Sequence, residues 1–157
     1  MSSTRRGNAL EAKAISILTR HFGYMLWAKA KRTPIYVNRP GVNSARFVVG
    51  GGGSDLVDGS TDAILGKREG PAAILLLQVT TTNGASARRQ KLRFVLPRLP
   101  THLLTVMLWA WDDKENAFRV FRMEDDFLER GWRIDAKTDG VWPWDKPEKT
   151  TKQVSLT

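Results

Sequence analysis

The sequence predicts an α/β fold in which helices flank a central, mixed β-sheet. Apolar residues recur at helical spacing from Leu10 to Phe22. Residues 72–80 form an almost continuous apolar run, which is typical of a central strand covered on both faces. A basic segment of helical character follows at 86–96, and two more strand-like runs come after it. An order of helix, strands, helix and strands favours an α/β sandwich around one sheet.

Turn residues set the limits of these elements. Gly23 stops the first helix, Asn83 and Gly84 break the apolar strand, and Pro97 ends the basic helix. Residues 33–53 hold two prolines and four consecutive glycines, so we expect a turn-rich loop there. The expected helices are 8–22, 86–96 and a short one at 124–130, and the expected strands are 25–31, 61–66, 72–80, 103–111 and 118–123.

Length and composition predict one domain. The chain has 157 residues, and we place the domain at 1–137 and a polar, partly disordered C-terminal extension at 138–157. No apolar run approaches the ~20 residues of a membrane helix, and no signal peptide is visible, so a cytoplasmic protein is expected. The absence of cysteine excludes thiolate metal sites. Any catalytic metal would have oxygen ligands, which suits Mg²⁺ or Mn²⁺.

The charge is distributed unevenly along the chain. Residues 1–100 hold 16 lysines and arginines but only five carboxylates, whereas residues 101–157 are slightly acidic. A strongly basic portion indicates a polyanionic partner such as DNA. Carboxylates are rare there, and metal-assisted phosphodiester cleavage needs a few of them to bring a cation to the phosphate.

Two predicted neighbouring strands bring polar side chains together. Gln78 and Thr80 share one face of their strand because alternate residues do. Asp62 begins the preceding strand, which a short turn joins to this one. An amide inside an apolar run is costly unless it is satisfied, either by backbone and water or by a ligand.

Glu11 is the fourth oxygen-bearing candidate. It lies in register with Ile15, Leu18 and Phe22, so it faces the core. A metal would partner its carboxylate, although Asn8 and Glu11 also fit a helix capping box.

This pattern resembles a known family, the archaeal-type Holliday junction resolvases. Asp62-Ala63-Ile64-Leu65 is similar to that family's motif aspartate, and Leu77-Gln78-Val79-Thr80 sits where the PD-(D/E)xK nuclease superfamily carries its (D/E)-x-K. The resemblance spans roughly residues 5–95. Its opening helix is matched by Arg6-Gly7, Glu11, Ala14, Leu18 and Gly23-Tyr24.

The resemblance implies a restriction endonuclease-like fold and a Mg²⁺- or Mn²⁺-dependent endonuclease that cuts branched DNA as a homodimer. Glu11 and Asp62 would be metal ligands, and Gln78 would take the second acidic position. Two departures weaken the motif: Gln78 replaces an acid and Thr80 replaces the lysine. Lys91 on the following helix is the candidate replacement for that lysine, and Arg88 and Arg89 are alternatives. The expected catalytic set is therefore Glu11, Asp62, Gln78, Thr80 and Lys91.

Several assignments stay open. Asp55 and Asp58 either replace the missing acid or belong to a polar loop. The two motif losses also allow a nuclease-like fold that binds nucleic acid without cutting it, and a basic adaptor for protein or RNA is a third reading. Core packing is expected for Trp109, and an interface or a covering flap for Trp142 and Trp144. The residues expected to contact DNA backbones are Arg5, Arg6, Lys29, Lys31, Arg32, Arg88 and Arg89.

Overall fold

A computed structural model gives the fold of the chain. It describes residues 3–30, 33–38, 46–52, 61–70, 72–125 and 130–146, with side chains for 6–30, 61–70, 72–124 and 130–146. The two helices in these ranges are α1 (Ser3–His21) and α3 (Ala85–Val95). The strands are β1 (Met25–Lys29), β2 (Thr33–Asn38), β3 (Arg46–Gly52), β4 (Ala63–Gly66), β5 (Ile74–Thr81), β6 (Leu104–Asp112), β7 (Ala117–Arg122) and β8 (Trp132–Ile134).

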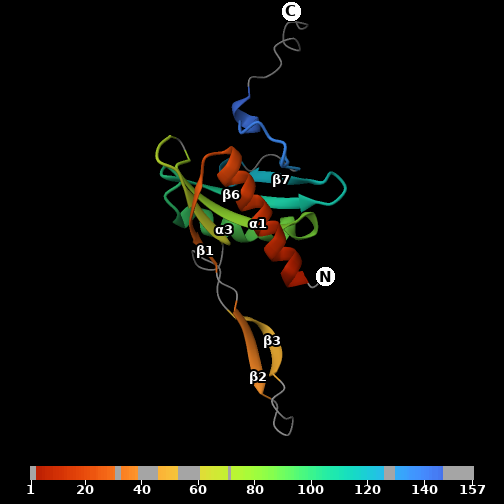
Figure 1. Cartoon of the computed structure of the whole chain (residues 1–157). Coiled ribbons are helices and arrows are strands. Elements are labelled where there is room, and N and C mark those ends of the chain that lie inside the picture. The colour runs from red at the N-terminus through yellow and green to blue at the C-terminus, as the bar shows by residue number, and fades with distance from the viewer. Residues whose placement is uncertain are drawn as a thin grey trace, which may run out of the picture.

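Six strands form one mixed sheet in the order β1-β4-β5-β6-β7-β8. β5 and β6 are parallel, and every other neighbouring pair is antiparallel. The parallel pair needs a crossover connection, and α3 supplies it. Figure 1 shows α1 crossing one face of the sheet and α3 lying behind it. The protein is therefore the predicted α/β fold, a six-stranded mixed sheet with two helices packed against it.

The two faces of the sheet carry separate apolar cores. Leu75, Leu77 and Val79 of β5 pack with α1, whereas Leu76 packs with α3. This alternation is the two-residue period of a strand. It directs Gln78 and Thr80, the two polar residues of the candidate motif, to the α3 side.

The structure differs from the prediction in the segment after β1. We expected a loop over 33–53, but β2 and β3 pair with each other as a separate two-stranded sheet. Three glycines of β3 lie opposite Thr33, Pro34 and Ile35. The prediction was wrong because strand pairing uses backbone groups, which glycine carries like any other residue.

Two smaller differences lie near the C-terminus. Strand β8 was not predicted, and it extends the sheet beyond β7. The helix expected over 124–130 is described only as far as residue 125, and there the chain forms a 3₁₀ turn at Met123–Asp125.

The C-terminal segment packs onto the domain as far as it is described. Trp142 is buried and stacks on Phe22 at the end of α1, with ring centroids 3.7 Å apart. Trp144 stacks in turn on Trp142 at 4.8 Å. Trp109 is fully buried, as predicted. None of the helices in the described ranges has both the length and the apolar character that crossing a membrane requires.

Candidate functional site

A buried pair of polar side chains joins β4 to β5. Ala63 lies opposite Leu77 in this antiparallel pair, so Asp62 comes opposite Gln78. The Gln78 Nε2 donates a hydrogen bond of 2.7 Å to Asp62 Oδ2, and the backbone N–H of Val79 donates another of 2.7 Å to the same oxygen. Both side chains are only 1% exposed. The sequence prediction that the Asp62 and Gln78 side chains meet is confirmed.

The backbone of Asp62 is held between two strands. Its N–H donates to Leu77 O, and its carbonyl accepts from the N–H of Ala30, both at 2.8 Å. Asp62 therefore sits where β4 begins, fastened to β5 on one side and to the end of β1 on the other. Few rotamers are available to a side chain so enclosed, which fixes the direction of its carboxylate.

The amide of Gln78 has a defined orientation. An ionised carboxylate only accepts hydrogen bonds, so the NH₂ group of Gln78 must face Asp62 and the carbonyl Oε1 must point away. Within the described part of the chain, this buried Oε1 has no hydrogen-bond partner. An unsatisfied buried acceptor costs about 1–3 kcal/mol. An amide oxygen is also a ligand for hard cations such as Mg²⁺, so this atom is suited to a metal.

Glu11 approaches the same end of the sheet from the α1 side. The hydroxyl of Tyr24 just after α1 donates to Ala72 O before β5, while the Nζ of Lys13 lies 4.1 Å from the ring of Trp111 at the far end of β6. Since β5 and β6 are parallel, the N-terminal half of α1 overlies their C-terminal ends. Glu11 is 5% exposed. Thus Asp62 and Gln78 are in direct contact, and Glu11 lies over that end of the sheet.

Asp62, Gln78 and Glu11 carry oxygen atoms of the kind that Mg²⁺ and Mn²⁺ prefer as ligands. Gln78 faces the α3 side of the sheet with its Oε1 turned away from Asp62, whereas the buried Glu11 carboxylate belongs to α1 on the other side. Within the described residues, no group of three His, Cys, Asp or Glu side chains is arranged to hold a metal. A metal site here would therefore need the amide oxygen of Gln78 in addition to carboxylates. Asp55 and Asp58 lie outside the described residues.

The basic residues of α3 do not all face the sheet. Its buried residues Ala85, Leu92 and Val95 face the sheet, and Arg88 lies half-buried on that same stripe. Lys91, the predicted substitute for the motif lysine, is exposed and lies off the stripe. Arg88 thus faces the side of the sheet that carries Gln78 and Thr80. The spacing of residues 85, 88, 92 and 95 in the sequence is the signal that identifies this stripe.

Thr80 lies close to the start of α3. It is half-buried, and a Cβ on Gly84 would collide with the Thr80 hydroxyl. Gly84 therefore allows the chain to turn tightly from β5 into α3. Thr80 carries no charge, so it cannot neutralise a phosphate as the motif lysine would.

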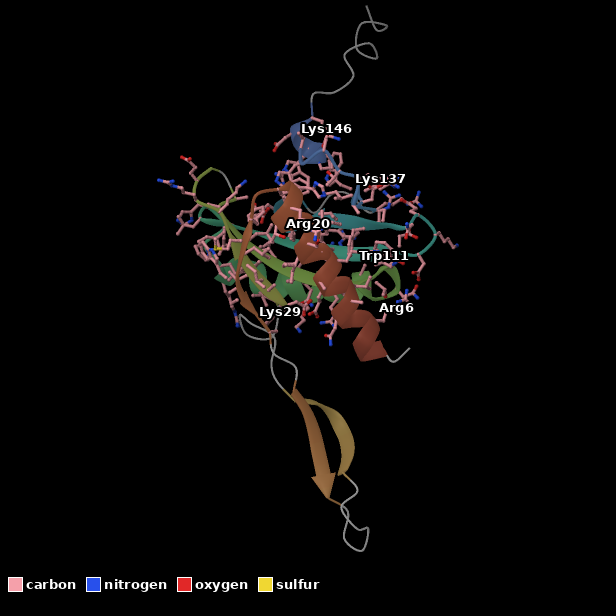
Figure 2. The ribbon with its side chains drawn as sticks, viewed as in Figure 1. Arg6, Arg20, Lys29, Trp111, Lys137 and Lys146 are labelled. Carbon is pink, nitrogen blue, oxygen red and sulfur yellow. The ribbon has the colours of Figure 1, made fainter. Side chains whose placement is uncertain are left out.

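The other predicted DNA contacts are spread over the surface. Arg6 is exposed at the start of α1 and pairs with Asp113 in the β6–β7 turn, and Lys29 is exposed at the end of β1 (Figure 2). The hydrogen bond from Arg6, and a weaker effect of one from Trp111, lower the pKa of Asp113 below its usual value. Arg89 is half-buried. The side chain of Arg5, and Lys31 and Arg32, lie outside the described residues.

Comparison of the chain with models of known protein families, with curated proteins and with solved structures finds no match.

Proposed function

We propose that the protein is a metal-dependent endonuclease that cuts branched DNA, as Holliday junction resolvases do on the four-way intermediates of recombination. The observation that carries the proposal is the buried Asp62–Gln78 pair, whose amide oxygen is left without a hydrogen-bond partner. The pair lies within a basic portion of the chain, which suits a polyanionic substrate.

Each residue has a role that follows from its position. Asp62, Gln78 and Glu11 would hold Mg²⁺ or Mn²⁺, with the Gln78 amide turned so that its Oε1 faces the ion. When bound, such an ion activates water for attack and neutralises charge on the phosphate. The guanidinium of Arg88 would attract the phosphate from the α3 side, because a guanidinium is cationic and hydrogen-bonds phosphate oxygens in pairs. Symmetrical cleavage of a junction needs two such sites, so the proposal includes a homodimer.

Cleavage of a synthetic four-way junction tests the proposal. The wild-type protein should cut the junction with Mg²⁺ or Mn²⁺ and not with EDTA. Asp62→Asn should lower the rate by about 100-fold or more, because it removes the charged ligand. Asp139→Asn is the matched control, since Asp139 is an exposed carboxylate in the C-terminal segment, where it pairs with Lys146. Absence of cleavage by the wild type, or equal rates for wild type and Asp62→Asn, contradicts the proposal.

A second candidate function is binding of branched DNA without cleavage. The observation that favours it is that Gln78 satisfies Asp62 directly, so the pair holds together without a cation. A gel shift of the junction that EDTA leaves unchanged, with no cleavage product, would support this candidate over the endonuclease.

A further inference from the structure

A cavity of about 330 Å³ lies between the start of α3 and the ends of β6 and β7. It is rich in groups that bind anions: three guanidiniums and two hydroxyls against one carboxylate. The three arginines and the aspartate leave its lining with a formal charge of +2. These residues are Arg89, Arg119, Arg130, Thr82, Ser86 and Asp112.

Neighbouring side chains hold two of the three arginines in place. The guanidinium carbon of Arg89 lies 4.6 Å from the ring centre of Phe121, which is itself buried. Arg119 pairs with Glu115, four residues before it. Arg133 lies 3.6 Å from Glu115 but closer to Asp135, at 2.9 Å. Arg130 is exposed and completes the lining of the cavity.

The one carboxylate of the lining, Asp112, accepts hydrogen bonds within the turn that follows β6. Asp112 Oδ1 accepts the backbone N–H groups of Lys114 and Glu115, at 2.9 and 3.3 Å. Ala85 and Ser86 of the first turn of α3 line the other wall, where the Ala85 N–H donates to Thr82 O. A guanidinium presents paired donors that match the oxygens of a phosphate. The lining therefore favours a phosphate group.

The cavity lies on the same face of the sheet as Gln78. Ala110 lines the cavity and pairs with Thr80, and Leu108, two residues earlier, pairs with Gln78. Strands are about 4.8 Å apart and residues rise about 3.3 Å along a strand, so Ala110, one strand and two residues away, is offset from Gln78 by ~8 Å. One strand of DNA advances about 3.4 Å per nucleotide along the helix axis. The displacement thus corresponds to a few nucleotides.

We infer that this cavity binds a phosphate group of the substrate strand, a few nucleotides from the phosphate that is cut. This inference rests on the proposed function. It adds Arg119 and Arg130, which the sequence did not single out, to the residues that hold nucleic acid. It also gives Arg89 a defined role, in place of general contact with a DNA backbone.

Binding without cleavage tests the inference separately from the enzyme activity. The dissociation constant of the full-length protein for a four-way junction is measured in EDTA at several salt concentrations. Arg89→Gln and Arg130→Gln should each weaken binding by about tenfold, because each removes a charge-assisted hydrogen bond. Each should also lower the slope of log Kd against log salt by about 0.9, the value for one phosphate contact. Arg20→Gln is the control, since Arg20 is exposed at the far end of α1.

The source of the phosphate is distinguished with short oligonucleotides that carry or lack a 5′-phosphate. If Arg89→Gln loses affinity equally for both oligonucleotides, the cavity binds an internal phosphate. If it loses affinity only for the phosphorylated oligonucleotide, the cavity binds the phosphate at a strand end. The inference is overturned if both cavity variants bind like Arg20→Gln, or if the wild type binds no nucleic acid. Loss of binding in the cavity variants of a protein that cuts nothing would retain phosphate binding by the cavity and remove the endonuclease. Melting temperatures equal to that of the wild type show that the variants are folded.

Discussion

At the residue scale, Gln78 decides how the candidate site is held together without a cation. A glutamate there would put two carboxylates at the 2.7 Å separation now spanned by the Gln78–Asp62 hydrogen bond. Two buried like charges repel strongly, so an acidic pair needs a cation between its members. The amide of Gln78 replaces that repulsion with a bond between β4 and β5. The expected consequence is a stable metal-free site with weaker affinity for the metal.

The first prediction is that Gln78→Glu lowers the stability of the metal-free protein and raises its affinity for the metal. Without metal, the free energy of unfolding should fall by about 2 kcal/mol or more, because a hydrogen bond becomes a repulsion between buried groups. With Mg²⁺ or Mn²⁺, the melting temperature of Gln78→Glu should rise by more than that of the wild type.

Thermal unfolding with and without each metal measures this difference. Gln90→Glu is the matched control because Gln90 is exposed on α3, and it should respond to metal like the wild type. If Gln78→Glu melts at the wild-type temperature in EDTA, the hydrogen bond to Asp62 is not what stabilises this site.

At the element scale, the sequence predicted what depends on neighbours in the chain. The short turn between β4 and β5 made their pairing predictable, and with it the contact between Asp62 and Gln78. The roles of β8 and Trp142 depend on contacts far apart in the sequence. Strand β8 has three residues, too few to show a period, and Trp142 packs on a ring at Phe22. The orientation of the Gln78 amide likewise became defined only once Asp62 was placed beside it.

The second prediction concerns the link between α1 and the start of β5. The Tyr24 hydroxyl donates a 2.6 Å hydrogen bond to Ala72 O. Ala72 has a φ of +58°, a strained conformation for a residue other than glycine. Burial raises the pKa of Tyr24 from 10.0 to about 12. Tyr24→Phe should therefore lower the free energy of unfolding by about 1 kcal/mol near pH 7, because it removes this hydrogen bond.

The raised pKa also predicts a pH dependence. In the unfolded chain Tyr24 loses its proton above about pH 10, whereas in the folded protein the proton stays until about pH 12. Ionisation therefore favours the unfolded state, so this contribution is complete below pH 10 and is lost between pH 10 and 12. Urea unfolding across this range should show a steeper loss for the wild type than for Tyr24→Phe. Parallel curves would contradict the assignment.

At the scale of the whole molecule, the C-terminal segment belongs to the core. Phe22, Trp142 and Trp144 stack in sequence, and the guanidinium carbon of Arg122 lies 4.6 Å from the ring of Trp144. This stack joins the end of α1, the C-terminal segment and strand β7. It lies on the α1 side of the sheet, where Trp142 packs in the same core as Leu77, whereas Gln78 faces the α3 side. The stack and Gln78 therefore lie on opposite faces of one sheet.

The third prediction follows from this stack. Trp142→Ala should lower the free energy of unfolding by about 3–5 kcal/mol, the usual cost of removing a buried tryptophan. Trp27→Ala is the matched control, since Trp27 is 55% exposed on edge strand β1 and surface substitutions change stability by about 0.5 kcal/mol or less. Urea unfolding at neutral pH measures both variants. A cost for Trp142→Ala no larger than that for Trp27→Ala would mean that residues 138–146 do not stabilise the domain. Because the stack and Gln78 lie on opposite faces of the sheet, a Trp142→Ala protein kept below its melting temperature should bind the junction as the wild type does.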